Sequence, residues 1–102
     1  MTGPMAKTFR TLTAGSTAPN VNAGDMYITA NSKKAVKIAT FGKGGEGQQI
    51  TILFQDNNTT LAHNTKTMFL AGAQDVRLNI GDTIQLVFYK DIWYETSRSD
   101  NS

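Results

Sequence analysis

The chain has 102 residues, of which 39% are hydrophobic and 18% are charged, and its net charge at pH 7 is +2. A chain of this length forms one domain with a modest core. It has no cysteine, which excludes disulfides and thiol chemistry, and no apolar run approaches the roughly 20 residues of a membrane span. The basic residues form no run or stripe, which argues against a nucleic-acid partner.

The first 19 residues are expected to be an arm or linker. Residues 1–5 place a second methionine after a Gly-Pro pair, which suggests residues added in cloning, and residues 13–20 are rich in Gly, Ser and Pro. We therefore place a single β domain at residues 20–99. The polar residues 100–102 are expected to be a frayed tail.

Short runs in which apolar and polar residues alternate, separated by turn residues, predict β-strands. The abundant Thr, Asn and Gly residues favour strands and turns over helices. We predict an all-β fold, either a small β-sandwich or a set of β-helix-like rungs. The predicted strands cover residues 25–30, 35–41, 48–54, 75–80, 83–90 and 92–97, with a further short rung at 60–62 and a compact apolar run at 67–71.

The last three runs are predicted to form an antiparallel meander over residues 75–97. Gly at the first position of the pair 81–82 fits a two-residue type II′ hairpin turn, and the pair 90–91 links the next two strands.

The predicted strand at residues 83–90 is apolar on both faces. A lone fold of this size hides less apolar surface than this strand and its neighbour present, so we expect sister chains to cover the second face in an intertwined homotrimer. The expected trimer-interface residues are Leu86, Val87, Phe88, Tyr89 and Ile92.

Residues 42–47 (Gly-Lys-Gly-Gly-Glu-Gly) formally match the fingerprint of dinucleotide-binding loops. That mechanism needs a helix directly after the loop, and residues 48–54 predict a strand instead. We interpret the segment as a tight corner between strands, where several positions need glycine. The expected structural turn residues are Gly44, Gly45, Gly47, Gly81 and Asp82.

The residue types offer no catalytic constellation. His63 is the single histidine and falls in a polar loop, where a solvated surface residue is expected. Residues 56–58 (Asp-Asn-Asn) resemble a fragment of a calcium loop without its other ligands. Most carboxylates fall at predicted turns, and so small a domain rarely encloses a sugar-sized cleft between two of them. We predict a non-enzymatic protein with no cofactor and no metal.

Tyr89, Trp93 and Tyr94 lie close together in the last predicted hairpin. Large aromatic side chains at such positions pack in the core, are buried between copies of the chain, or stack on sugars. Under the third alternative, Trp93 and Tyr94 are the predicted glycan-binding residues.

An ordered series of short motifs resembles a known family, the closing segments of phage tailspikes, tail fibres and neck-appendage proteins whose main body is a parallel β-helix. The resemblance covers about residues 20–99. Its motifs are residues 41–54 (Phe-Gly-Lys-Gly-Gly-Glu-Gly-Gln-Gln-Ile-Thr-Ile-Leu-Phe), 69–72 (Phe-Leu-Ala-Gly), 81–86 (Gly-Asp-Thr-Ile-Gln-Leu) and 93–99 (Trp-Tyr-Glu-Thr-Ser-Arg-Ser).

The resemblance implies a homotrimeric, all-β tip domain that registers three chains and takes part in host attachment. It also implies a place in the virion tail, with synthesis in the host cytoplasm and action outside the cell. The catalytic β-helix body of those relatives has no counterpart in these residues, so depolymerase activity is not implied.

Three functions therefore compete. The first is a structural trimerisation and attachment tip, and the second is a module that binds bacterial surface polysaccharide. The third is a small barrel for single-stranded nucleic acid, which needs exposed aromatics beside a basic groove and which the scattered charges disfavour. We expect neither nucleic-acid binding nor membrane insertion.

Overall fold

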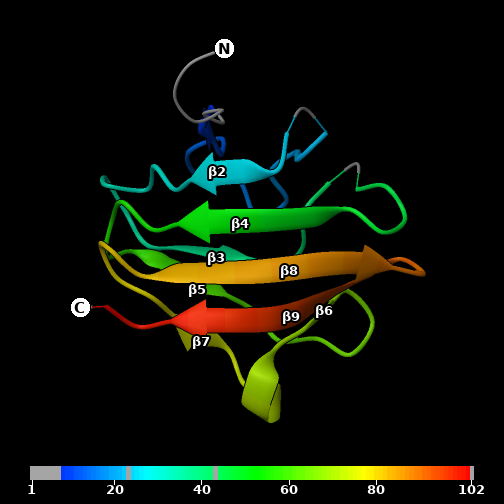
Figure 1. The fold of residues 1–102 in the computed structure, drawn as a ribbon. Helices are drawn as coiled ribbons and strands as arrows, with labels where there is room; N and C mark the ends of the chain where they lie inside the picture. The colour runs from blue at the N-terminus through cyan, green and yellow to red at the C-terminus, as the bar shows by residue number, and fades with distance from the viewer. Residues whose placement is uncertain (1–7, 23, 43, 102) are drawn as a thin grey trace.

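The computed structural model describes residues 8–22, 24–42 and 44–101, and they form an all-β fold of two sheets (Figure 1). The prediction of an all-β fold is confirmed. The large sheet contains, in spatial order, β1 (Arg10–Thr11), β2 (Met26–Ile28), β4 (Gln49–Leu53), β8 (Thr83–Tyr89), β9 (Ile92–Ser99) and β6 (Met68–Phe69). The small sheet contains β3 (Val36–Ile38), β5 (Thr59–Leu61) and β7 (Val76–Arg77), and a short 3₁₀ turn, η1, covers Ala71–Ala73.

The N-terminal half of the fold is a stack of parallel coils. The chain passes from β2 to β3 and then from β4 to β5, so that it alternates between the two sheets. Strand β4 lies parallel to β2, β5 lies parallel to β3, and β1 continues the parallel stack beside β2. These parallel coils correspond to the second of the two predicted alternatives, the β-helix-like rungs, and β5 overlaps the short rung predicted at residues 60–62.

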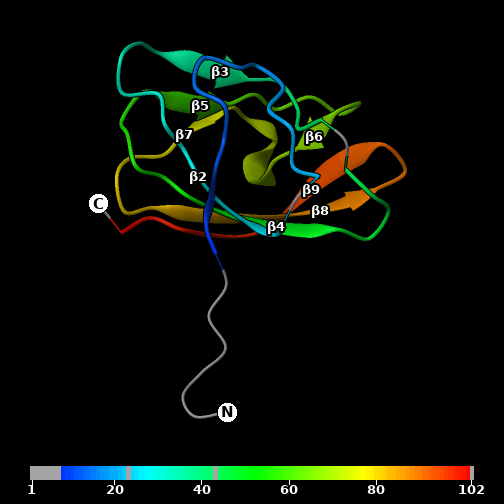
Figure 2. The ribbon, with the colours of Figure 1, turned by 90° about the horizontal axis from the view of Figure 1, so that it is seen from above.

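The C-terminal half reverses the strand direction. Strand β8 pairs antiparallel with β4, and β7 pairs antiparallel with β5. Strands β8 and β9 form an antiparallel hairpin, whose turn residues Lys90 and Asp91 both have positive φ, as a type I′ turn requires. The two sheets lie as separate layers when the molecule is seen from above (Figure 2).

The predicted meander over residues 75–97 is wrong in its first strand. Strand β7 belongs to the small sheet, so the segment after it crosses between layers and the Gly81-Asp82 pair is not a hairpin turn. Gly81 has φ +95°, and the buried Asp82 accepts a hydrogen bond of 2.7 Å from the Asn79 N–H. Alternation identifies Val76 and Leu78 as inward-facing but not the exposed Ile80, and it does not say which sheet the strand joins.

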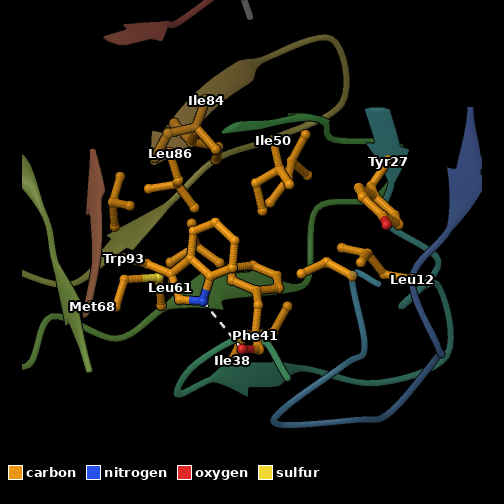
Figure 3. Close-up of a cluster of buried hydrophobic side chains, with 14 of the residues drawn as sticks. Leu12, Tyr27, Ile38, Phe41, Ile50, Leu61, Met68, Ile84, Leu86 and Trp93 are labelled. Carbon is orange, nitrogen blue, oxygen red and sulfur yellow. Dashed lines mark hydrogen bonds between the residues drawn. The ribbon is translucent and has the colours of Figure 1, made fainter. Parts of the chain in front are cut away.

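The core lies between the two layers and is formed by the inward-facing side chains of both sheets (Figure 3). Trp93 is fully buried, and its indole N–H donates to the Phe41 carbonyl at 3.1 Å, while the two rings meet edge to face. Buried residues include Tyr27, Ile50, Ile52, Ile84, Leu86 and Met68 from the large sheet and Val36, Ile38, Leu61 and Val76 from the small sheet.

A buried polar cluster joins two successive corners of the stack. Asp56 is 3% exposed and accepts hydrogen bonds from the Asn31 N–H at 2.7 Å and from the Asn58 N–H and the Thr59 hydroxyl at 2.8 Å. Burial raises the pKa of the Asp56 carboxyl, but these hydrogen bonds outweigh burial and hold the pKa below its ordinary value of 3.8. The Asn58 side chain in turn donates to the Asn31 carbonyl at 2.8 Å, so each corner fastens the next.

Both predicted domain boundaries need correction. Residues Arg10–Thr11 form a strand and Leu12 is buried in the core, so the expected arm at 1–19 contributes to the domain from residue 10 onward. Residues 1–7, including the suspected cloning residues, lie outside the described part. Asn101 is also held, because its N–H donates to Asp82 at 2.7 Å and its side chain donates to the Gly81 carbonyl at 2.9 Å. The expected fraying therefore does not begin at residue 100.

Candidate interaction surface

The outer side of the large sheet is defined by strand alternation. In β8, Ile84 and Leu86 are buried, so the residues that alternate with them, Gln85 and Val87, point away from the core. Pairing with neighbouring strands carries this outer side across the sheet, because paired residues share a face. We call this surface the outer sheet face; it comprises Thr11, Met26, Ile28, Gln49, Thr51, Leu53, Thr83, Gln85, Val87, Tyr89, Ile92, Tyr94, Ser97, Ser99 and Phe69.

The outer sheet face contains no charged side chain among these strand residues, although the chain has ten basic and eight acidic residues. Nearby charge lies at its rim, where the hairpin turn places the Lys90 ammonium 5.3 Å from the centre of the Tyr89 ring. A solvated sheet face ordinarily carries charged residues, so their absence from all the outward strand positions that the structure describes is informative.

Apolar side chains gather at the β8, β9 and β6 end of the face. Val87 pairs with Tyr94 and Tyr94 pairs with Phe69, while Tyr89 pairs with Ile92 in the next row. Tyr89 is 51% exposed and Phe69 is 41% exposed. We call these five residues the apolar cluster. Within it the rings of Phe69 and Tyr94 are stacked, with their centres 6.2 Å apart and their planes 20° from parallel; we call this ring pair the aromatic platform.

The structure separates the predicted interface residues into two groups. Leu86 is 1% exposed and faces the core, and Phe88 packs against the same core, so the assignment of these two to a trimer interface is wrong. Val87, Tyr89 and Ile92 lie on the outer sheet face, and their role in an interface stays a prediction.

The predicted glycan-binding pair is also split. Trp93 is fully buried behind the sheet and cannot reach a sugar, so that assignment is wrong. Tyr94, its neighbour, points outward and is half-buried, so its role stays a prediction. Phe69 was missed because its strand is two residues long and pairs in parallel with a distant strand, a contact that leaves no periodic signal.

The Gly-rich segment forms a corner before a strand. Gly47 has φ +80° and donates its N–H to the Phe88 carbonyl at 2.8 Å, and β4 begins two residues later. Gly45 donates to the Gln48 side chain at 2.9 Å, which closes the turn. A Cβ atom on Gly44 would lie 2.6 Å from the Trp93 ring, so this position requires glycine for close packing. With a strand after it, the segment lacks the helix that a dinucleotide site needs.

His63 differs from the prediction of a solvated side chain. It is half-buried, its Nδ1 accepts the Leu70 N–H at 3.1 Å, and its ring meets Phe69 edge to face at 4.9 Å. The ring therefore fixes the loop that carries β6. Within residues 8–22, 24–42 and 44–101, no group of three or more His, Cys, Asp or Glu side chains gathers into a metal-binding arrangement. No helix in the described part of the chain is long and apolar enough to cross a membrane.

The small sheet presents an outer face of opposite character. Its central row is Lys37, Thr60 and Arg77, and the Lys37 ammonium lies 3.1 Å from the Asp75 carboxylate. The hydrogen bond from the backbone N–H of His63 lowers the pKa of the Asp75 carboxyl below its ordinary value, and the hydrogen bond from the Lys37 ammonium lowers it further. This face carries charge at each side of its row.

No protein-family model and no curated protein matches the sequence.

Proposed function

We propose that the chain is a non-enzymatic structural domain that associates with copies of itself through the outer sheet face. The form that fits best is the homotrimeric attachment tip of a phage tail fibre or tailspike. The observation that carries the proposal is the complete absence of charge from a face that exposes Tyr89 and Phe69. A domain in this role belongs to the virion tail, is made in the host cytoplasm and acts outside the cell.

Rotational symmetry explains why an uncharged face suits self-association. Around a symmetry axis the same patch of each copy faces its neighbours, so a charge near the axis meets the same charge of another copy. Such like-charge contacts cost several kcal/mol. A face without charge avoids this cost. A face that binds a charged partner would instead carry residues of the opposite charge.

The composition of the apolar cluster supports the same proposal. The cores of protein interfaces are enriched in Tyr and Phe and depleted in charged residues, and the surrounding rim is polar. The apolar cluster provides two tyrosines, Phe69 and two aliphatic side chains, and the Thr, Gln and Ser residues of the face surround it. Apolar side chains that gather on one face and are partly exposed to solvent favour an interaction site there.

The direction of the strands supports a terminal position on a fibre. The stack is parallel where β1 and β3 form its edges, and a preceding coil can add to parallel edges. It becomes antiparallel at β7 and β8, which interrupts the parallel repeat. This arrangement agrees with the family resemblance, which implies a domain that follows a parallel β-helix.

Sedimentation equilibrium at micromolar concentration tests the proposal. We expect a species of three times the mass of one chain, and a stable monomer would refute self-association. Val87→Glu places a carboxylate in the apolar cluster and is expected to lower the association constant at least about 100-fold. Thr60→Glu is the matched control, because it adds the same charge between Lys37 and Arg77 on the other face. The control should retain the trimer.

A second function, recognition of host surface polysaccharide, is favoured by the aromatic platform. Sugar rings stack on exposed aromatic side chains, and the rings of Phe69 and Tyr94 lie in the same row of the sheet as Gln49, whose amide can hydrogen-bond a sugar hydroxyl. Tyr94→Ala should abolish the binding of uncharged glycans on an array while sedimentation still reports a trimer. If the variant loses the trimer and no glycan is bound by the parent, the platform serves assembly alone.

A further inference from the structure

A pocket lies at a corner of the stack, away from the outer sheet face. It has a volume of about 340 Å³ and opens between the loop before β2 and the turn after it. This volume is at the lower end of the range for small-molecule sites, about 300–1,000 Å³. The pocket is lined by Ala14, Gly15, Ala30, Asn31, Ser32, Lys33 and Lys34.

The floor of the pocket is held rigidly. Asn31 is 6% exposed, its side-chain oxygen accepts the Gly15 N–H at 2.8 Å, and its amide donates to the Thr59 hydroxyl at 2.9 Å. These hydrogen bonds join the loop at Gly15 to the buried corner at Asn31 and Thr59. They therefore hold the two sides of the pocket, before and after β2, at a fixed distance from each other. A preformed site loses less conformational entropy when a ligand binds.

The charge at the pocket is positive. Lys33 and Lys34 line it, both are exposed, and neither forms an ion pair with any residue in the described part of the chain. No carboxylate belongs to the lining. The nearby Asp56 is buried, and its oxygens accept hydrogen bonds from inside the corner. Two ammonium groups without an ion-pair partner among the described residues, beside a formed cavity, provide the chemistry that binds an anion.

We propose that this pocket binds one acidic sugar unit through its carboxylate. Lys33 and Lys34 provide the cations, and the Ser32 hydroxyl provides a hydrogen-bonding group. The small residues Ala14, Gly15 and Ala30 leave space for one ring. The anion chemistry follows from the lysines alone, whereas the choice of a sugar rests on the proposed role in host attachment. The pocket uses none of the residues of the outer sheet face, so assembly and sugar binding are separable.

Titration of the ¹⁵N-labelled chain, followed by amide chemical shifts, tests the proposal with three probes. Glucuronate is expected to produce saturable shifts confined to residues 14–15 and 30–34, with a dissociation constant in the millimolar range. Glucose has a similar ring without the carboxylate, and inorganic phosphate is an anion without a ring. Each is expected to bind at least about tenfold more weakly, because it lacks one half of the recognised chemistry. Equal binding of glucose or of phosphate would overturn the assignment.

Matched variants complete the test. The double variant Lys33→Ala/Lys34→Ala should weaken glucuronate binding at least about tenfold, and Ser32→Glu should do the same with both lysines present. Lys37→Ala/Lys66→Ala removes the same charge elsewhere and should leave the affinity unchanged. Equal losses in both double variants would show nonspecific attraction and refute the site. Sedimentation of Lys33→Ala/Lys34→Ala should still show the parent assembly, so failure of this proposal is distinguishable from failure of self-association.

Discussion

The two outer faces of this small sandwich differ in charge although the same alternation of strand residues produces both. The face of the small sheet places Lys37 and Arg77 on either side of Thr60, with Asp75 paired to Lys37. The outer sheet face uses Thr, Gln, Ser and apolar side chains and has no charged residue at its outward-facing strand positions. Because folding constrains inward positions far more than outward ones, the difference between the outward positions reflects what each face meets. The small-sheet face has the charge that suits water, whereas the outer sheet face lacks it, as the proposed contact between copies requires.

The largest expected effect tests the boundary between the core and the outer sheet face. Trp93 and Tyr94 are adjacent, but only Trp93 is fully buried. Trp93→Ala should lower the free energy of unfolding by about 3–5 kcal/mol, because it removes a large buried ring and leaves a cavity. Tyr94→Ala, measured in the same denaturant series at a concentration where the chain is monomeric, should cost about 1 kcal/mol or less. Equal losses would show that the two residues do not lie on opposite sides of the sheet.

The next effect concerns the buried polar cluster around Asp56, which joins two successive corners of the stack. Asp56→Asn replaces an acceptor-only carboxylate with an amide, whose NH₂ group must point at one of the donors from Asn31, Asn58 or Thr59. Hydrogen bonds to charged groups contribute about 1.5–3 kcal/mol, so a loss of stability of this size is expected at neutral pH. Asp75→Asn is the control on the exposed small-sheet face and should shift the unfolding midpoint much less.

The pH dependence of Asp56 has a definite sign. Its pKa is lower in the folded chain than its ordinary value of 3.8, so the folded state binds fewer protons than the unfolded state around that pH. The stabilisation is complete above about pH 5 and is lost as the pH falls through the folded pKa. The parent chain should therefore lose stability below about pH 4 more steeply than Asp56→Asn. If the free energy of unfolding falls equally steeply below about pH 4 in the parent and in Asp56→Asn, this carboxylate does not contribute as proposed.

A smaller effect tests how closely the Gly-rich corner packs beneath the large sheet. Gly44→Ala forces a Cβ atom to within 2.6 Å of the Trp93 ring and 3.2 Å of the Phe88 ring. Overpacking of this kind costs about 1–3 kcal/mol, and we expect the lower end because a corner relaxes more readily than a central strand. Gly45→Ala is the control, since a Cβ there meets nothing within 4 Å. If both variants unfold at the same denaturant concentration as the parent, the packing at Gly44 is looser than the structure shows.

Local alternation predicted the strands well but not their long-range partners. The runs at 48–54 and 83–90 alternate clearly, and the structure places their inward and outward residues accordingly. The run at 75–80 alternates equally well, yet it joins the other sheet, because pairing depends on contacts far apart in sequence. Ile92, Trp93 and Tyr94 are all large and apolar, so alternation alone does not reveal which faces the core. The aromatic platform and the pocket lined by Lys33 and Lys34 both combine segments that no local pattern links.

The smallest expected effect is that of salt on the association constant, which should hardly change. This measurement distinguishes the two faces most directly. Raising NaCl from about 0.1 to about 1 M shortens the Debye length from about 10 to about 3 Å and screens exposed charges. Association through the uncharged outer sheet face should keep the same or a slightly higher constant, because apolar contacts do not depend on screened charge. Association through Lys37, Arg77 and Asp75 would weaken steadily over the same range. Sedimentation at several salt concentrations distinguishes these results, and a fall of tenfold or more would assign the contact to the small-sheet face and exclude the one proposed.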